Sequence, residues 1–283
     1  MIHLLLTGVA MLAFAANSLL ARAALQGGGV DAFSFTAMRL FAGAAVLGFL
    51  LWRQGGFRPG RSMPGSWVSA SALLGYSLGF SLAYLRLGAA TGAVILFASV
   101  QTSMIGWGLL RGHRPSMQEI LGLVIAGGAF VWLMAPGVQA PDPAGAAAMV
   151  IAGISWGVVS LRGGGRGTAM EGSSGNFLRA SALILPILAM AAVLGALREP
   201  QARAVGLALF SGGVTSGLGY ALWYRVLPHL TPLQAASVQL TVPVIAALGA
   251  VAVLGEMLSL RLVLAGGLIL GGVALTVLGR RRG

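Results

Sequence analysis

Residues 98–128 read ASVQTSMIGWGLLRGHRPSMQEILGLVIAGG, and residues 236–267 read ASVQLTVPVIAALGAVAVLGEMLSLRLVLAGG. Both stretches consist of two apolar runs joined by a short turn. ASVQ recurs after 138 residues, and LVIAGG returns as LVLAGG after 139 residues. Arg39, inside an apolar run as AMRL, has a counterpart 140 residues later in Arg179 of FLRA. Three matches in the same order at nearly the same shift indicate a duplicated half.

The composition indicates that a lipid bilayer surrounds most of the chain. Of its 283 residues, 57% are hydrophobic and 8% are charged, and the mean hydropathy is +0.90. A soluble domain carries charge on about a quarter of its residues. The 18 basic residues, all arginine, lie between apolar runs, which argues against a nucleic-acid-binding protein. The lack of cysteine excludes disulfides, thiolate metal sites and cysteine nucleophiles.

Windows of about 20 residues identify membrane-spanning helices. Ten apolar segments lie at about residues 2–25, 33–52, 67–87, 90–110, 117–135, 143–161, 177–197, 203–224, 231–253 and 258–279. We therefore predict an all-α integral membrane protein of ten transmembrane helices, with one five-helix repeat over residues 1–140 and a second over 141–283. Because five is odd, the second repeat must enter the membrane from the opposite side. Such inverted-topology repeats are typical of alternating-access transporters.

The arginine distribution predicts the orientation. If the N-terminus is cytoplasmic, eleven arginines lie inside, namely Arg53, Arg58, Arg61, Arg111, Arg114, Arg162, Arg166, Arg225, Arg280, Arg281 and Arg282. Five lie outside, namely Arg22, Arg86, Arg198, Arg203 and Arg261. The excess of positive charge inside predicts that both termini are cytoplasmic. The loop RGGGRGTAMEGSSG follows the sixth segment, and we interpret its first part, RGGGRG, as a flexible cytoplasmic linker between the two halves.

Arg39 and Arg179 lie within apolar segments, where charge is costly. One interpretation is structural, since each long side chain can snorkel to the headgroups or bond to carbonyl groups at helix ends. Their mirrored depths favour this shared architectural role. The alternative is functional: each guanidinium holds a carboxylate or phosphate at one mouth of a pathway, because intramembrane charges tend to face the interior.

The acidic residues all fall in predicted loops or at helix ends, at Asp31, Glu119, Asp142, Glu171, Glu199 and Glu256. SMQE, at residues 116–119, has the pattern of a capping box that opens a helix. A proton-coupled exporter of organic cations needs a buried carboxylate that alternately holds a proton and the substrate. The absence of an acid from the middle of any segment therefore disfavours cation antiport.

The run ASVQLTVPVIAALGAVAVLGEMLSLRLVLAGGLILGGVAL resembles the EamA-type members of the drug/metabolite transporter superfamily. The most specific features are Pro243, the Gly255-Glu256 pair and the glycine-rich last segment. In the first half Ser103 to Ile105 stand at the proline position and RGHRP replaces the Gly-Glu pair, so the halves have diverged. The resemblance implies an inner-membrane exporter or exchanger of small metabolites, with amino-acid exporters a prominent branch. Small multidrug relatives carry a glutamate in the first helix, where this chain has Asn17.

Two aromatic stripes are candidates for lining a substrate pathway. Tyr76, Phe80 and Tyr84 are spaced four residues apart in the third segment and share one helical face. The eighth segment has a comparable face of Tyr220, Trp223 and Tyr224. Such faces stack on a substrate while hydroxyl and indole N–H groups orient it. Interfacial belts and helix packing are the alternative interpretation. The predicted substrate-binding residues are Asn17, Tyr76, Phe80, Tyr84, Gln101, Ser155, Trp156, Tyr220, Trp223, Tyr224, Ser237 and Gln239.

Gln101 and Gln239 occupy the same place in the repeated ASVQ. Because a buried amide is costly without a partner, we expect these two side chains to face each other, water or substrate. The alternative is interhelical bonding alone. GYSLG fits the nucleophile-elbow pattern, but it lies in an apolar helix and no histidine is placed to act as a base beside Ser77. We therefore expect no enzyme activity, no catalytic residue, no metal and no cofactor.

The sequence thus favours a secondary transporter that exports or exchanges small metabolites, with amino acids foremost, by alternating access. The expected location is the inner membrane, with multiple spans and both termini cytoplasmic. The expected partners are a small-molecule substrate and the lipid bilayer, with no nucleic acid, and the chain is compatible with a monomer. The alternatives are an exporter of lipophilic drugs or organic cations and, in a different class, a channel or non-transporting scaffold.

Overall fold

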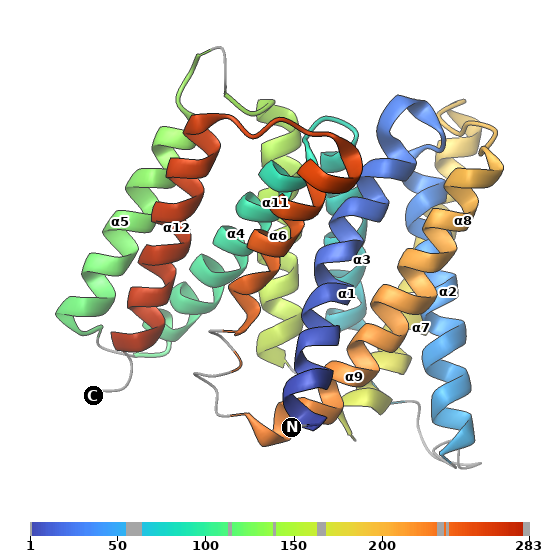
Figure 1. The fold of residues 1–283 in the computed structure, drawn as a ribbon. Coiled ribbons are helices and arrows are strands. Elements are labelled where there is room, and N and C mark those ends of the chain that lie inside the picture. Colours follow the sequence, from blue (N-terminus) through green and yellow to red (C-terminus); the bar gives the residue numbers. More distant parts are fainter. Residues whose placement is uncertain are drawn as a thin grey trace.

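The computed structural model describes residues 2–54, 64–112, 115–137, 140–162, 168–230, 235 and 238–279. Every regular element in these ranges is a helix (Figure 1). The first half contains α1 (Ile2–Leu25), the short η1 (Gln26–Gly28), α2 (Ala32–Arg53), α3 (Trp67–Tyr84), α4 (Ala89–Leu110) and α5 (Met117–Met134). The second half contains α6 (Pro143–Arg162), α7 (Ala169–Val193), α8 (Ala202–Phe210), η2 (Ser211–Leu218), α9 (Gly219–Val226), η3 (Leu227–His229), α11 (Thr241–Leu254) and α12 (Leu260–Gly279).

Eight helices in the described ranges are long and apolar enough to cross a membrane. One of them, over Ala202–His229, joins α8, η2, α9 and η3 into a single span. Of the other two helices, α3 is rich in serine and glycine, and α11 is a shorter apolar helix of 14 residues. The prediction of an all-α membrane protein is therefore confirmed.

Two predicted boundaries differ from the structure. The seventh helix was expected at residues 177–197, but α7 begins at Ala169, so the prediction of a loop through TAMEGSSG is wrong. The cause is a capping box: the Thr168 hydroxyl accepts from the Glu171 N–H, and the Glu171 carboxylate accepts from the Thr168 N–H at 2.7 Å. The GGGRG part of the predicted linker lies outside the described residues. The ninth segment was expected from residue 231, whereas α11 begins at Thr241 and most of residues 231–237 are outside the described ranges.

The predicted capping box at the start of α5 is confirmed. The Ser116 hydroxyl accepts from the Glu119 N–H, and the Glu119 carboxylate accepts from the Ser116 N–H at 2.7 Å. These bonds satisfy backbone donors that the first turn of a helix leaves open. Glu119 is therefore used for local structure.

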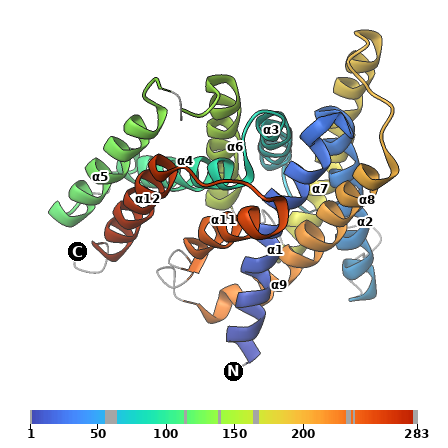
Figure 2. The same ribbon diagram turned by 45° about the horizontal axis from the view of Figure 1, so that its top comes forward.

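Successive long helices run in alternating directions, so both termini lie at the same end of the bundle (Figure 1). α2 packs against α7 and η2, α6 packs against α3 and α4, and α1 packs against α9 and α11. α5 and α12 form a pair at one side of the bundle (Figures 1 and 2). Their backbones approach closely, because a Cβ at Gly122 would overlap Thr276 and the carbonyl group of Gly272. Small residues permit such close helix packing in membranes.

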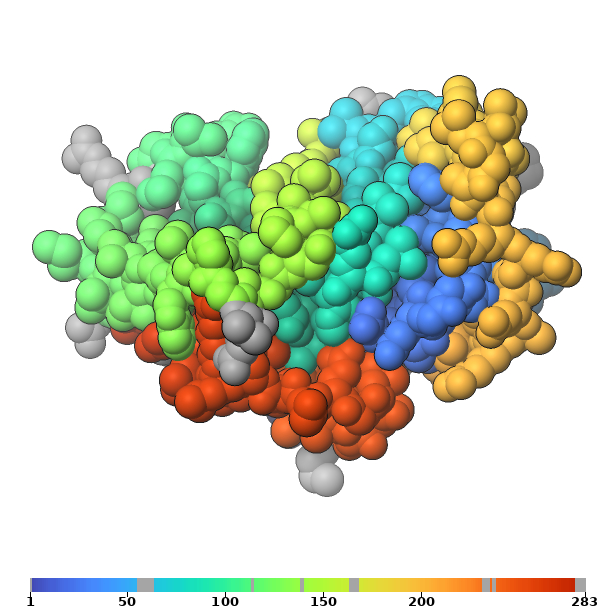
Figure 3. Space-filling view, turned by 90° about the horizontal axis from the view of Figure 1, so that it is seen from above, coloured from blue at the N-terminus to red at the C-terminus, as the bar shows by residue number. Residues whose placement is uncertain are grey.

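Glu256 connects several helices at the end of the bundle opposite the termini. Gly255 ends α11 in the left-handed conformation, with φ +66°, and the Glu256 carboxylate then accepts from the N–H of Ala89 at 2.9 Å, at the start of α4. The same carboxylate lies 3.5 Å from Nε of Arg22, whose Nη1 donates to the Tyr84 carbonyl at 3.0 Å. Figure 3 looks onto this end and shows the orange-red segment after α11 against the blue and teal first half. The Gly255-Glu256 pair therefore connects α11 to α1, α3 and α4.

Candidate functional site

A cavity of about 280 Å³ lies between α1, α3, α4, α6, α9 and the chain before α11. Three of its lining residues, Ser160, Ala169 and Leu227, lie close to the ends of α6, α7 and α9. In Figure 1 these helix ends are at the same side of the bundle as the termini. The cavity therefore extends from the middle of the bundle toward that end. Its lining consists of Phe14, Asn17, Ser18, Tyr76, Phe80, Leu96, Phe97, Gln101, Met104, Trp156, Val159, Ser160, Ala169, Tyr220, Trp223, Tyr224, Leu227, Ala235 and Gln239.

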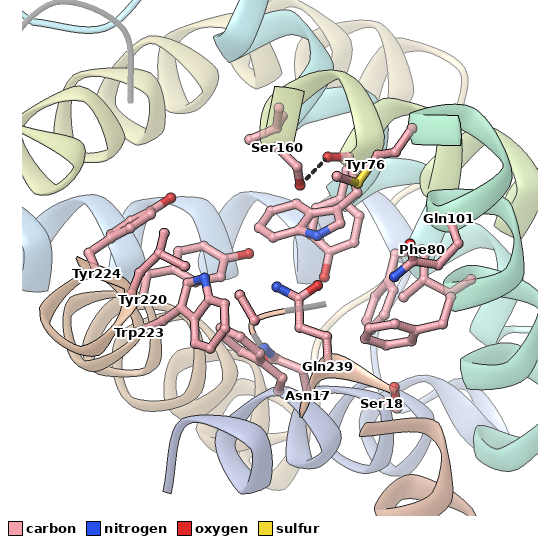
Figure 4. A pocket seen from close by; sticks show the side chains of 18 of the residues that line it. Asn17, Ser18, Tyr76, Phe80, Gln101, Ser160, Tyr220, Trp223, Tyr224 and Gln239 are labelled. Atoms are coloured by element: carbon pink, nitrogen blue, oxygen red, sulfur yellow. Dashed lines mark hydrogen bonds between the residues drawn. The ribbon is translucent and has the colours of Figure 1, made fainter. Parts of the chain in front are cut away.

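The structure brings most of the predicted binding residues to this cavity (Figure 4). Tyr84 is not among them: it is buried beyond Phe80, and Gly92 of α4 packs directly on its ring. Ser155 does not line the cavity either, because it faces the backbone of α3 at Gly75. Ser237 lies outside the described residues. The cavity-lining members of the predicted set are Asn17, Tyr76, Phe80, Gln101, Trp156, Tyr220, Trp223, Tyr224 and Gln239.

Several lining residues were not predicted from the sequence. Phe14 precedes Asn17 by three residues on α1, and Phe97 precedes Gln101 by four on α4. Residues three or four apart on a helix share a face. The helical spacing of Phe14 from Asn17 and of Phe97 from Gln101 is therefore the sequence signal that identifies these two phenylalanines.

The two aromatic stripes meet through Trp156. Its ring centroid lies 4.8 Å from that of Tyr76 on α3 and 5.3 Å from that of Tyr220 on α9, where the two planes are stacked at 22°. Tyr76 contacts Phe80 in turn, with ring centroids 5.5 Å apart. A continuous aromatic wall therefore joins helices from both halves of the chain. Rings arranged in this way offer flat apolar surface with polar tips.

Asn17 faces the cavity, but its amide is engaged with η2. The Asn17 carbonyl oxygen accepts from Ser211 Oγ at 2.8 Å and from the Thr215 hydroxyl, and Nδ2 donates to Ser216 Oγ at 3.4 Å. η2 is a π-helical turn inside the long α8–α9 span, a feature that often occurs at functional sites. The wider turn brings three hydroxyl side chains toward α1, so Asn17 helps to hold the wall of the cavity.

Gln101 and Gln239 behave differently from Asn17. Both line the cavity, and within the described part of the chain neither side chain forms a hydrogen bond. No hydrogen bond joins the two amides to each other in those ranges. Figure 4 shows the Gln239 amide projecting among the aromatic side chains. Each amide therefore has a carbonyl oxygen and an NH₂ group that can bond to water or a solute.

Arg39 does not snorkel to the headgroups, contrary to one form of the structural expectation. Its side chain is buried, with 1% of the residue exposed. Nη2 donates to the Tyr76 hydroxyl at 3.0 Å, and Nε donates to Ser216 Oγ at 3.3 Å. The guanidinium carbon also lies 4.8 Å from the ring centroid of Phe80. Arg39 therefore sits immediately behind the cavity wall.

Arg179 has partners of a different kind from those of Arg39. Its Nη1 donates to the Pro64 carbonyl at 2.6 Å and to the Gly175 carbonyl at 3.2 Å. The guanidinium carbon lies 5.6 Å from the ring centroid of Trp67, the first residue of α3. Arg179 thus anchors the chain at the start of α3, as the structural interpretation expected for both. The difference arises because Arg39 meets the middle of α3, whereas Arg179 meets its beginning.

Comparisons with known proteins place this arrangement in a family. Residues 143–278 match the sequence model of the EamA-like transporter family. The chain is 49% identical over 272 residues to a Pseudomonas aeruginosa protein named "Uncharacterized protein PA1977", covering 96% of this chain and 93% of that protein. The chain belongs to the EamA-like transporter family. A solved structure described as "Crystal structure of protein" shares the fold of this EamA-like transporter, with a TM-score of 0.66 over 98% of both chains at 20% identity.

Family membership makes the chain a multi-pass membrane transporter of small molecules. The region matched includes Pro243 and the Gly255-Glu256 pair that carried the resemblance in the sequence. Pro243 lies in the first turn of α11, where proline removes no intrahelical hydrogen bond. The cavity between the two halves is the candidate solute site of this EamA-like transporter.

Proposed function

We propose that this EamA-like transporter exports or exchanges small neutral or zwitterionic amino acids by alternating access. The observation that carries the proposal is the lining of the central cavity. It combines an aromatic wall with two amides that have no protein partner in the described ranges, Gln101 and Gln239, and its described lining includes no acidic residue. The proposed location is the inner membrane, with both termini cytoplasmic.

The chemistry of the lining supports this substrate class. Aromatic faces bind apolar side chains by burial and stacking, and tyrosine hydroxyls and glutamine amides can bond to ammonium and carboxylate groups. Solute sites in proteins are commonly apolar cavities of about 300–1,000 Å³ with a few placed polar groups. The observed volume of about 280 Å³ is close to the lower end and suits a small solute.

The helix arrangement supports alternating access. The pairs α2–α7 and α5–α12 each join a helix to its counterpart in the other proposed repeat. Such pairing is expected when a two-fold axis relates inverted repeats. The cavity extends toward the end with the termini, whereas Glu256 joins both halves at the other end. This arrangement has the form of a state open to one side only.

The favoured test is counterflow in liposomes. Purified protein is reconstituted with an unlabelled amino acid inside, and uptake of labelled amino acid is measured across a panel of amino acids and small metabolites. Saturable uptake that requires internal amino acid supports the proposal. Flux that neither saturates nor responds to internal solute would indicate a channel, and no flux of any solute would indicate a scaffold.

An exporter of lipophilic drugs or organic cations is the competing transporter function. That function predicts uptake of a cationic dye driven by an imposed pH gradient, with no response to amino acids. A matched pair of variants links either result to the cavity. Phe80→Ala changes the lining, and Phe41→Ala removes the same side chain from an exposed position on α2, where 44% of the residue is accessible. Only the first substitution should alter the apparent affinity.

A further inference from the structure

We propose that Arg39 supplies the positive charge that recognises the carboxylate of the transported solute, acting on the cavity through the Tyr76 hydroxyl. This inference rests on the proposed function and deepens it by assigning the anion-recognising end of the site. Arg39 is a positioning residue in this scheme, because Tyr76 touches the solute and Arg39 stands behind it.

The geometry places the cation one side chain away from the cavity. Tyr76 and Phe80 both line the cavity, and the Arg39 guanidinium carbon lies 5.1 Å and 4.8 Å from their ring centroids. Arg39 Nη2 donates to the Tyr76 hydroxyl oxygen at 3.0 Å. The guanidinium is therefore held against the back of two lining side chains.

The charge of Arg39 has no anionic partner in the described chain. The ion pairs within those ranges are Arg22–Glu256 and Arg86–Asp142, and neither includes Arg39. Nη1 of Arg39 is buried without a hydrogen-bond partner in the same ranges. An arginine side chain stays protonated in proteins, so burial cannot neutralise it. The two aromatic faces and two hydroxyl groups offset part of the cost of burial.

This pattern differs from that of Arg179. Arg179 bonds to backbone carbonyls, which are fixed acceptors, whereas Arg39 bonds to hydroxyl groups. A hydroxyl that accepts from a cation keeps its own proton, and the bond polarises that proton toward the next acceptor. The Tyr76 hydroxyl therefore becomes a stronger donor. Tyr220 also lines the cavity, and its ring stacks on Trp156, which contacts Tyr76.

These contacts specify the orientation and class of the solute. A carboxylate at this wall would accept from the Tyr76 hydroxyl, with the positive charge of Arg39 directly behind that hydroxyl, and the Tyr220 hydroxyl offers a second donor. The unengaged amide of Gln239 can donate to the same carboxylate. The apolar side chain of the solute would then lie along Trp156 and its neighbouring rings. The site thus favours an α-amino acid with an apolar or aromatic side chain over its amide or amine.

The test compares solutes that differ only in the carboxylate. Binding and counterflow of phenylalanine, phenylalaninamide and phenethylamine are measured with the full-length protein, and leucine, leucinamide and isoamylamine form a second series. We expect the amino acid to bind about ten- to a hundredfold more tightly than its amide, as for a charge-assisted hydrogen bond. Arg39→Gln and Tyr76→Phe should reduce that preference to within about threefold, and Arg39→Lys should retain part of it.

Two control variants separate recognition from folding. Arg179→Gln removes the other intramembrane arginine, and Tyr84→Phe removes a tyrosine hydroxyl that is outside the cavity. Both should keep the acid-to-amide preference of the unmodified protein. The ratio of two affinities in one variant does not depend on folded yield, so a merely structural role would leave it unchanged.

Each outcome decides the inference. Equal binding of acid and amide by the unmodified protein overturns it while leaving amino-acid transport intact. A folded Arg39→Gln variant with the full preference also overturns it. If that variant does not fold, the ratios in Tyr76→Phe and Arg39→Lys decide. Exchange of none of the solutes in either series would refute the proposed function, and this inference with it.

Discussion

Glu256→Gln should destabilise the transporter, because this carboxylate joins three helix ends in a partly buried position. The substitution keeps an oxygen that can accept from the Ala89 N–H, but it removes the charge that faces Arg22. Both side chains are only 18% exposed. A hydrogen bond to a charged group contributes about 1.5–3 kcal/mol and a neutral bond about 0.5–1.5 kcal/mol. The expected loss of unfolding free energy is therefore about 1–2 kcal/mol.

Asp142→Asn is the matched control for this loss. Asp142 also pairs with an arginine at 3.5 Å, accepts from a backbone N–H at the start of a helix, and keeps that acceptor as asparagine. Its pair with Arg86 is more exposed, at 35% and 57% of the two side chains. Exposed ion pairs contribute about 0–1 kcal/mol. The expected loss is therefore less than half of that for Glu256→Gln.

Unfolding of each variant is measured by denaturant titration in mixed micelles. The single variants Arg22→Gln and Glu256→Gln and the double variant Arg22→Gln/Glu256→Gln complete a double-mutant cycle. The double-mutant cycle should give a coupling energy of about 1 kcal/mol between Arg22 and Glu256. Equal losses for Glu256→Gln and Asp142→Asn would refute the reasoning from burial. A coupling energy of zero would show that Glu256 acts through the α4 N-terminus alone.

Three further outcomes are expected. A cysteine at Met257, which is 97% exposed, should react with an impermeant thiol reagent in intact cells, whereas one at Gln54 should be protected; the reverse pattern would invert the proposed orientation. Arg179→Ala should lower the unfolding free energy by about 1–3 kcal/mol, because the partly buried Pro64 carbonyl loses its donor, and an unchanged denaturation midpoint would contradict the anchoring role. Phe80→Ala should weaken solute binding about ten- to a hundredfold in a titration, and an equal effect of Phe41→Ala would contradict the assignment of the cavity.

Local patterns in the sequence determined the fold class and much of the chain's organisation. Apolar windows separated by glycine, proline and arginine identify membrane helices, because an apolar stretch of sufficient length is unstable in water and must satisfy its backbone within itself. The spacing of Ser116 and Glu119 in the sequence also predicts the capping box at the start of α5. Thr168 and Glu171 have the same capping-box spacing, although they follow a glycine-rich stretch that is typical of a loop. The start of α7 was therefore predictable from the residues themselves.

Membership of the cavity was decided by tertiary structure. Helical spacing shows that Tyr76, Phe80 and Tyr84 share a face, but it does not show what covers each part of that face. α4 packs its glycine against Tyr84 and buries it, whereas the neighbouring turns of α3 face open space. Ser155 and Trp156 are adjacent in sequence, yet one faces α3 and the other faces the cavity.

The two intramembrane arginines are the clearest case in which the sequence alone does not identify the neighbours of a side chain. The sequence places Arg39 and Arg179 in apolar segments and predicts that a repeat relates them, but it leaves their roles open. Their partners come from segments distant in the chain: Ser216 and Tyr76 for Arg39, and Pro64 for Arg179. The electrostatic environment of a side chain depends on all the groups around it, and helix packing decides which groups those are. For that reason only the tertiary structure distinguished an anchored cation from one held behind the cavity wall.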